Sequence, residues 1–283
     1  MLGTKKEGRD AALFFSYGTC HWSLVTCHCF LLRGRLCSYN RMVRRQRVSL
    51  CAGPGSPLTG NWGGGFCNLN NMNSTTEKLS ALRVIPVLRL TTRAGAESAI
   101  DCLIEAGFRT VELTLTTPGA IELIAALRRR IGTDFLVGAG TVLDLDTAKA
   151  CLEAGADYLV SPCLVTGMGK LANDAGRAAL LGGFTPTEVL AAWREGAAVV
   201  KVFPAATGGP AHLAALHAIY PQIPLCPTGG VSAANLLDYF KAGAAVVGIG
   251  NNVIDQKALT EGNRAQVISH AQSFLELAKR NGA

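Results

Sequence analysis

Residues 194–204 read REGAAVVKVFP. They combine the polar end of a helix, a glycine and a near-continuous apolar run that stops at Pro204. A glycine directly after a helix takes the left-handed conformation that ends it. An apolar run of this kind is typical of a strand buried on both faces, as in a parallel sheet. The stretch therefore predicts one helix-to-strand junction of an α/β protein.

The same junction recurs along the chain. Glycine separates a polar helix end from an apolar strand at Gly107, Gly155, Gly196 and Gly243, and less clearly at Gly132 and Gly176. Successive glycines lie 20 to 25 residues apart up to Gly196, and the 47 residues before Gly243 hold one further strand. Strands alternating with helices at this period indicate parallel βα units.

Eight such strands can be counted, which predicts a single-domain (β/α)₈ TIM barrel. The predicted strands are 84–89, 110–115, 135–140, 158–161, 179–181, 198–203, 223–226 and 245–249. Helix starts are expected at Thr117-Pro118, at Ser232 and at Thr185, where Thr185 to Glu188 form a capping box with proline at the first helical position. A doubly wound open sheet is the alternative, but no G-x-G-x-x-G follows the first strand.

The barrel is expected to occupy residues 72–283, because residues 1–71 have a different composition. Up to Asn71 the chain has nine Lys or Arg against two acidic residues, whereas from Met72 onward it has 18 of each. We expect residues 1–71 to be a poorly structured extension, either transit-like or upstream of the true start. The folded domain carries no basic excess, so no nucleic-acid partner is expected.

Composition also argues against membrane and metal chemistry. No apolar run approaches the roughly 18 residues that a membrane span needs, so no membrane partner is expected. The histidines from Met72 onward are His212, His217 and His270, and they form no cluster with metal-ligand spacing. We therefore expect no metal site.

Lys201 and Glu112 are the candidate catalytic residues. Each is a charged residue inside an apolar predicted strand, where an unpaired charge is costly. Burial disfavours the charged form of an amine, and lysines in such places act as Schiff-base nucleophiles. A barrel could bring Glu112 beside Lys201, either as a structural ion pair or as a general acid/base beside a nucleophile. We favour the second reading.

Glycine pairs follow the seventh and eighth predicted strands. They are Gly229 with Gly230, after Thr228, and Gly248 with Gly250, before Asn251. Loops after these strands commonly form a phosphate site from main-chain N–H groups in such barrels. The pattern favours a phosphorylated substrate.

Five motifs follow one another along the chain: VELTLTTPGA at 111–120, GAGTVL at 138–143, Ser161-Pro162, VKVFP at 200–204 and PTGGV at 227–231. In this order and spacing, from about Leu79 to the C-terminus, they resemble the 2-keto-3-deoxy-6-phosphogluconate (KDPG) aldolases. That family also covers 4-hydroxy-2-oxoglutarate (KHG) aldolase activity. The resemblance implies a class I aldolase that works without a cofactor, usually as a homotrimer, in the Entner–Doudoroff pathway of carbohydrate metabolism.

The resemblance also implies a role for each matching residue. Lys201 would form the Schiff base and Glu112 would be the general acid/base. The remaining residues would bind a phosphorylated keto acid: Arg89, Thr114 and Thr141 near the pyruvate part, Pro162 and Phe203 along the pocket, and Thr228, Gly229, Gly230, Gly250 and Asn251 near the phosphate. KDPG would give pyruvate and glyceraldehyde 3-phosphate, and KHG would give pyruvate and glyoxylate.

Some positions depart from the family pattern and leave alternatives open. Thr116 stands where many members have Arg, Cys163 and Gly182 replace Gly and Pro, and Asn251 replaces Ser. At position 228 the threonine resembles the residue of the gluconate-type enzymes, whereas galactonate-type relatives tend to have an apolar residue there. The alternatives are a 2-keto-3-deoxy-6-phosphogalactonate aldolase, an isomerase or epimerase using Glu112 without a Schiff base, and a catalytically idle barrel. A cytoplasmic location is expected, or an organellar one if residues 1–71 are a transit peptide.

Overall fold

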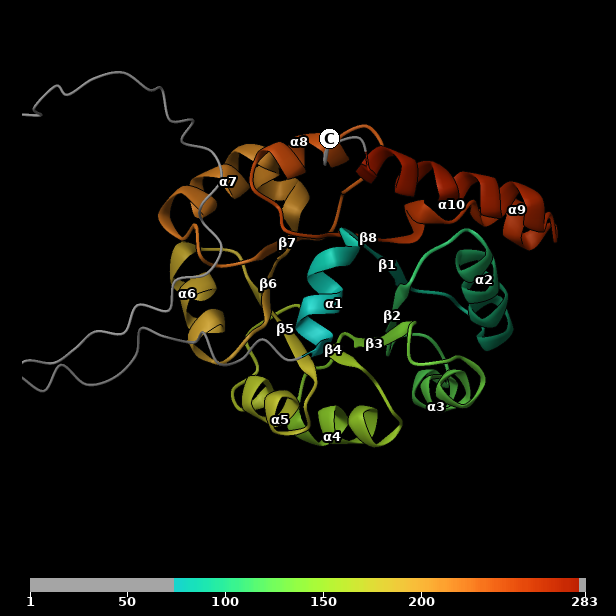
Figure 1. The fold of residues 1–283 in the computed structure, drawn as a ribbon, viewed down its shortest axis with the longest axis horizontal. Coiled ribbons are helices and arrows are strands. Elements are labelled where there is room, and N and C mark those ends of the chain that lie inside the picture. Colours follow the sequence, from blue (N-terminus) through green and yellow to red (C-terminus); the bar gives the residue numbers. More distant parts are fainter. Residues whose placement is uncertain (1–73, 280–283) are drawn as a thin grey trace, which may run out of the picture. The chain divides into compact units, whose positions relative to one another are not determined.

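The computed structural model describes residues 74–279. Eight parallel strands alternate with helices and form a barrel (Figure 1). The strands are β1 (Val84–Leu88), β2 (Thr110–Thr114), β3 (Leu136–Gly140), β4 (Tyr158–Val160), β5 (Ala178–Gly183), β6 (Val199–Val202), β7 (Leu225–Pro227) and β8 (Val247–Ile249). The predicted (β/α)₈ TIM barrel is confirmed, and each strand overlaps the range predicted for it. The predicted extension, residues 1–71, lies outside the described residues.

Helices surround the strands (Figure 1). They are α1 (Ser74–Leu82), α2 (Arg93–Glu105), α3 (Ala120–Arg130), α4 (Leu145–Glu153), α5 (Met168–Asp174), α6 (Pro186–Arg194), α7 (Ala205–Ile219), α8 (Leu236–Lys241), the 3₁₀ turn η1 (Asn251–Val253), α9 (Gln256–Thr260) and α10 (Arg264–Lys279). Among these described helices, none has both the length and the apolar character required to cross a membrane.

Strand pairing follows the chain order and then closes the barrel. The sheet order is β7-β6-β5-β4-β3-β2-β1-β8, so β8 pairs with β1, from Val84 with Val247 to Pro86 with Ile249. Two isolated bridges, Leu225 with Ala244 and Thr228 with Gly248, join the β7 and β8 segments. The carboxyl ends of all eight strands therefore meet at one end of the barrel.

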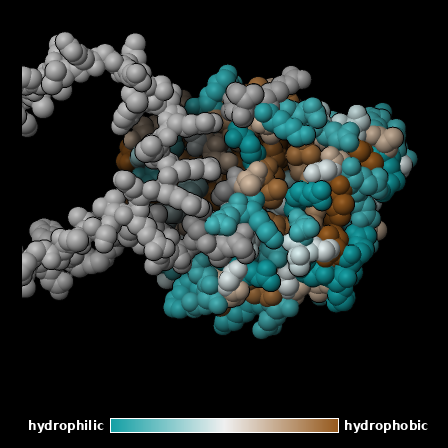
Figure 2. All heavy atoms as spheres, viewed as in Figure 1, coloured by the Kyte–Doolittle hydropathy of each residue, from teal (hydrophilic) through white to brown (hydrophobic). Residues whose placement is uncertain are grey.

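The barrel interior has a core of its own. Ile85, Leu136, Tyr158 and Val199 pack there with Leu79 of α1, and each of the five is at most 4% exposed. These residues lie near the start of their strands, so α1 covers the N-terminal end of the barrel (Figure 1). The same view in Figure 2 shows hydrophilic residues over much of this face, with hydrophobic residues interspersed. The closed N-terminal end leaves the opposite end for a site.

The left-handed glycines end the helices where the sequence predicted. Gly107, Gly155, Gly196 and Gly243 have φ values of 94 to 98°, and Gly176 has a φ of 68°. The prediction for Gly132 was wrong, because α3 ends at Arg130 and the next residue, Ile131, is already extended (φ −106°, ψ 137°).

Three predicted helix starts had different outcomes. The capping box at Thr185 is confirmed, since Thr185 accepts from the Glu188 N–H and Glu188 accepts from the Thr185 N–H. Hydrogen bonds from the Thr185 N–H, the Phe184 N–H and the Thr185 hydroxyl, in this order of effect, lower the pKa of the Glu188 carboxyl. The start at Thr117-Pro118 was wrong: α3 begins at Ala120, after Gly119 in a left-handed conformation, and the Thr117 hydroxyl accepts from the Leu90 N–H instead.

The predicted helix start at Ser232 was also wrong. Helix α8 begins at Leu236, because the Asn235 side chain accepts from the Ser232 N–H (2.8 Å) and donates to the Gly230 carbonyl (2.9 Å). This amide ties residues 230–235 into a turn before the helix begins. Sequence reasoning missed Asn235, although asparagine before a helix is a known signal for capping and turns.

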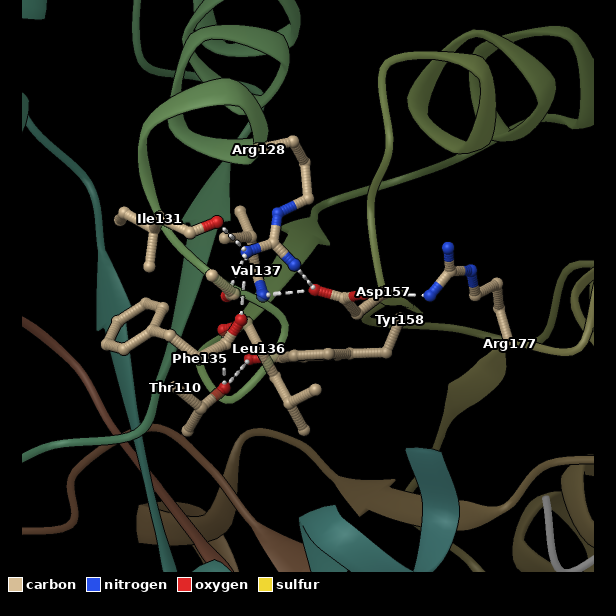
Figure 3. Close-up of polar contacts among 10 residues, drawn as sticks. Thr110, Arg128, Ile131, Phe135, Leu136, Val137, Asp157, Tyr158 and Arg177 are labelled. Carbon is tan, nitrogen blue, oxygen red and sulfur yellow. Dashed lines mark hydrogen bonds and ion pairs between the residues drawn. The ribbon is translucent and has the colours of Figure 1, made fainter. Parts of the chain in front are cut away.

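Asp157 lies directly before β4 and joins three elements (Figure 3). Its carboxylate pairs with Arg128 of α3 (2.7 Å) and with Arg177 (2.8 Å), and it accepts from the Val137 N–H of β3 (2.9 Å). Arg128 also donates to the carbonyls of Ile131, Gly132 and Phe135. The network lies near the N-terminal ends of the strands and fixes the connections into β3, β4 and β5.

Replacing Asp157 by alanine should therefore cost stability. The Asp157 side chain is 7% exposed and that of Arg128 is 16% exposed, so the change would leave a largely buried guanidinium without its carboxylate. We expect the free energy of unfolding to fall by about 3 kcal/mol, measured by urea denaturation. Asp174→Ala is the control, since Asp174 forms an exposed pair with Lys170 and should change the value by less than about 0.5 kcal/mol. Equal effects of the two changes would contradict a structural role for the network.

Candidate active site

Lys201 lies within β6 and points into the barrel. Its neighbours Val200 and Val202 pack into the core between strands and helices, whereas Val199, two residues earlier, packs in the barrel interior. Because strand residues alternate between faces, Lys201 shares the inner face with Val199. Its side chain is 6% exposed, and its Nζ lies 5.6 Å from the centre of the Phe203 ring.

Glu112 of β2 faces Lys201 across the barrel interior. The Glu112 Oε1 lies 3.5 Å from the Lys201 Nζ, and the Glu112 side chain is 3% exposed. Among the described residues, the buried charged ones are Glu112, Asp157 and Lys201, and the two arginines account for Asp157. The predicted proximity of Glu112 and Lys201 is thus observed. The pair leaves one amine and one carboxylate together in a water-poor interior.

Gly140, at the end of β3, makes room for the Glu112 carboxylate. A β-carbon built on Gly140 would lie 2.2 Å from the Glu112 Oε1, well inside van der Waals contact. Gly138, two residues earlier, has the same relation to the Tyr158 ring, at 2.1 Å. Each glycine of this strand therefore lets one large side chain reach the barrel interior. Sequence reasoning placed both glycines at a strand end but did not identify this function.

Gly140→Ala should displace the Glu112 carboxylate from Lys201. We expect kcat to fall by about 10²-fold, since small displacements of a catalytic group have effects of this size. Steady-state kinetics on the purified variant would measure the change. Gly132→Ala is the matched control, because a β-carbon there meets nothing within 4 Å. Full activity of Gly140→Ala would contradict the requirement for this carboxylate position.

The loop after β3 contains a strained residue. Thr141 has a φ of 63°, which is rare for a β-branched side chain. Backbone strain of this kind costs on the order of 1–3 kcal/mol and is concentrated at functional sites. Thr141 follows Gly140 directly, so the loop presents the threonine next to the Glu112 position. The predicted substrate-binding residue thus lies at the correct end of the barrel.

Thr114 and Pro162 lie at the ends of β2 and β4. The Thr114 hydroxyl donates to the Leu88 carbonyl (2.9 Å) and lies 2.9 Å from the Thr116 hydroxyl, so it ties β2 to β1. Pro162 is partly exposed, and a β-carbon on Gly182 would lie 2.2 Å from its carbonyl carbon. Gly182, where the family pattern has proline, therefore allows the Pro162 loop to approach β5 closely.

The loops after β7 and β8 meet at the same end. Gly229 and Gly230 have φ values of 88 and 84°, which glycine adopts readily. Thr228 is 5% exposed and its hydroxyl lies 3.6 Å from the Cys226 Sγ. A β-carbon on Gly229 would lie 3.1 Å from the Phe203 ring, so this loop lies against the residues that follow β6. The predicted phosphate loops and the lysine strand are neighbours.

Arg89 and Asn251 form a direct contact that the sequence did not reveal. The main-chain N–H of Arg89 donates to the Asn251 Oδ1 (3.1 Å), and the Asn251 Nδ2 donates to the main-chain carbonyl of Arg89 (2.9 Å). The Arg89 side chain is exposed at the C-terminal end of β1. The contact brings together two residues predicted for opposite ends of the substrate.

The Cys226 thiol and the Tyr158 phenol also lie in the barrel interior. Cys226 pairs with Lys201 across the β6–β7 ladder, and burial raises the pKa of its thiol to about 11. Tyr158 donates or accepts a hydrogen bond with the Thr110 hydroxyl (2.9 Å), and burial raises the pKa of its phenol well above the ordinary value. Both groups are therefore neutral at physiological pH. No cluster of three metal-ligating side chains occurs within residues 74–279.

The chain is similar to known proteins of one family. A model of the KDPG and KHG aldolase family matches residues 75–270. The 2-dehydro-3-deoxy-phosphogluconate aldolase of Pseudomonas aeruginosa is 32% identical over 213 residues, covering 74% of this chain and 96% of the relative. A probable 2-dehydro-3-deoxy-6-phosphogalactonate aldolase of Rhizobium meliloti is 34% identical over 171 residues, covering 60% and 81%.

A solved structure gives a similar result. The KDPG aldolase of Legionella pneumophila, with pyruvate captured at low pH as a covalent carbinolamine intermediate, superposes with a TM-score of 0.65. The two sequences are 27% identical, and the match covers 70% of this chain and 97% of the other.

Proposed function

The chain belongs to the KDPG and KHG aldolase family and is a carbon–carbon lyase, and from this we propose that it cleaves 2-keto-3-deoxy sugar acid phosphates through a Schiff base on Lys201. One observation carries the proposal: the Lys201 Nζ lies 3.5 Å from the Glu112 carboxylate inside the barrel. A buried amine beside a carboxylate provides a nucleophile and a proton-transfer group, which together can carry out imine chemistry.

The first half of the reaction forms the imine. The Lys201 nitrogen attacks the C2 carbonyl of the keto acid with its lone pair and gives a carbinolamine, whose hydroxyl leaves as water after protonation. Glu112 takes the proton that the lysine nitrogen releases as it bonds to C2 and delivers it to the leaving hydroxyl, since it lies within reach of the nitrogen. The product is a protonated imine, which withdraws electrons from the neighbouring carbons.

The second half breaks the carbon–carbon bond. Glu112 accepts the proton of the C4 hydroxyl, directly or through water, and a carbonyl forms at C4. The electron pair of the C3–C4 bond moves to C3 and into the imine, which leaves an enamine on Lys201 and a free aldehyde. Protonation of the enamine at C3 and hydrolysis of the imine then release pyruvate and restore the amine. The imine takes the electrons that would otherwise make a bare carbanion.

Residues at the carboxyl ends of the strands would bind the rest of the substrate. We assign the pyruvate carboxylate and its neighbouring oxygens to Arg89, Thr114 and Thr141. The contact of Thr114 with β1 supports its place beside Arg89. Pro162 and Phe203 would line the pocket, and Phe203 lies beside the Lys201 amine.

The phosphate group would lie on the loops after β7 and β8. We assign it to the main-chain N–H groups of Gly229, Gly230, Gly250 and Asn251, with Thr228 beside them. The positive φ values of Gly229 and Gly230 support this assignment, because such turns expose consecutive N–H groups to an anion. In this arrangement Lys201 and Arg89 would face the keto-acid end and the glycine loops the aldehyde end.

KDPG is the substrate that we infer, with KHG as a second one. Thr228 supports the gluconate epimer through its resemblance to gluconate-type enzymes. The Rhizobium relative is named a galactonate aldolase, which makes the galactonate epimer the second candidate. A competition assay with both epimers at equal concentration measures the preference. We also infer a homotrimer in the cytoplasm, which sedimentation and cell fractionation would test.

Trapping with borohydride tests the proposed function. The purified protein is incubated with pyruvate, reduced with sodium borohydride and analysed by intact and peptide mass spectrometry. The expected result is one pyruvyl adduct on the peptide that contains Lys201. Absence of an adduct, together with retained isomerase or epimerase activity, would replace the Schiff-base reading with one in which Glu112 acts alone.

A further inference from the structure

The contact between Asn251 and Arg89 continues the barrel beyond its last strand pair. The β1–β8 ladder ends with Pro86 opposite Ile249. Two residues after Ile249, the Asn251 amide accepts from the Arg89 N–H at 3.1 Å and donates to the Arg89 carbonyl at 2.9 Å. A side-chain amide thus supplies the donor and the acceptor that a further strand residue would have supplied.

This contact fixes the position from which the Arg89 side chain leaves the main chain. Ile85 packs in the barrel interior and Val87 packs against the same cluster. Arg89 follows them on the same face by the two-residue alternation of a strand, at the open end of the barrel. Because β1 ends at Leu88, the Arg89 main chain has no ladder partner beyond it, and Asn251 takes that place.

The same contact directs both polar atoms of the Asn251 side chain toward Arg89. The family resemblance places serine at this position as a phosphate contact. In this chain one hydrogen of the Asn251 Nδ2 and one lone pair of its Oδ1 are directed to Arg89. A serine hydroxyl also has a hydrogen and acceptor lone pairs, but they lie on one atom closer to the main chain, whereas the two amide atoms of asparagine meet the N–H and the carbonyl of Arg89 separately.

We propose that the Asn251 side chain is a positioning residue for Arg89, the carboxylate-binding residue of the proposed reaction, and that it does not bind phosphate. This inference rests on the proposed function and deepens it. Asn251 acts on the keto-acid end of the substrate through Arg89, although it follows β8, whose loop is assigned to the phosphate end. Loss of the amide would let the Arg89 main chain move and would weaken binding of the carboxylate.

Pyruvate distinguishes the two roles because it has a carboxylate and no phosphate. Borohydride trapping at increasing pyruvate concentration gives a half-saturating concentration for wild type, Asn251→Ala, Asn251→Ser, Arg89→Ala and the Arg89→Ala/Asn251→Ala double variant. We expect Asn251→Ala and Asn251→Ser to raise it about 5- to 10-fold while the maximal trapped fraction stays unchanged. We expect the double variant to match Arg89→Ala, because both changes remove the same interaction.

Asn252→Ala is the matched control. Asn252 is the exposed neighbour of Asn251, and its carbonyl, which the substitution retains, accepts from His270. Its half-saturating pyruvate concentration should equal that of the wild type. Denaturation curves for each variant establish that all of them are folded under the conditions of trapping.

Two results would overturn the inference while leaving the proposed function in place. One is a wild-type half-saturating concentration in Asn251→Ala together with a raised KM for KDPG, which would make Asn251 a phosphate ligand. The other is additive effects of the Arg89 and Asn251 changes on pyruvate. Failure of the wild type itself to form an adduct is a different outcome, which overturns the proposed function and this inference with it.

Discussion

Replacing Lys201 by methionine is expected to abolish the pyruvate adduct and to lower kcat for KDPG cleavage by about 10⁴-fold or more. Methionine has a similar length and packs well in a buried site, but it has no nucleophilic nitrogen. No imine can then form, and the C3–C4 electron pair has no acceptor. Steady-state kinetics and borohydride trapping on the purified variant measure the two effects.

Loss of folding must be separated from loss of chemistry in this variant. Lys201→Met leaves the Glu112 carboxylate buried without its partner, which should cost about 3 kcal/mol of unfolding free energy. The Lys201→Met/Glu112→Gln double variant removes both charges and should recover most of that stability while remaining inactive. A double variant that regains stability and also forms a borohydride-stable adduct would show that another amine is the nucleophile.

Glu112→Gln is expected to lower kcat by about 10² to 10⁴-fold while Lys201 still forms the pyruvate adduct on long incubation, because water can supply the proton for imine formation more slowly. Glutamine keeps the shape of the side chain and its contact with Lys201 but cannot exchange a proton. The retained adduct distinguishes a proton-transfer residue from a purely structural partner of the lysine. Single-turnover cleavage of KDPG measures the rate, and trapping with saturating pyruvate measures the adduct.

Glu122→Gln provides the control for this change. Glu122 is exposed in the first turn of α3, so its substitution should leave both measurements at wild-type values. Wild-type cleavage by Glu112→Gln would assign the proton transfers to another group or to water. A lost adduct in Glu112→Gln would instead show that water cannot replace Glu112 in imine formation.

Most of the barrel could be predicted because its signals are local. A glycine after a helix needs no distant partner to adopt its left-handed conformation, and apolar runs of strand length are visible in the sequence. The failures at Thr117 and Ser232 share one cause: each residue was expected to start a helix, but hydrogen bonds to Leu90 and Asn235 fix a turn instead. Such competition between side chains and main chain is not visible in a pattern of residue types.

Only part of the site could be predicted from the sequence. Alternation within β2 and β6, once placed in one barrel, is sufficient to bring Glu112 toward Lys201. The Arg89–Asn251 contact was not predictable, because it joins residues 162 positions apart and depends on how β8 closes against β1. The space left by Gly140 also depends on the register of β2 against β3, where Thr114 lies opposite it.

The covered N-terminal end of the barrel has a consequence for the order in which products leave. Leu79 of α1 and the Tyr158 ring fill the interior below Lys201 and Glu112, so a ligand has one route in and the same route out. In the proposed reaction pyruvate stays bonded to the lysine when the aldehyde becomes free. An aldehyde whose phosphate is bound by the outer glycine loops, as proposed, would therefore depart first. Its departure would let in the water that hydrolyses the imine. Pyruvate would then leave second, through the same opening.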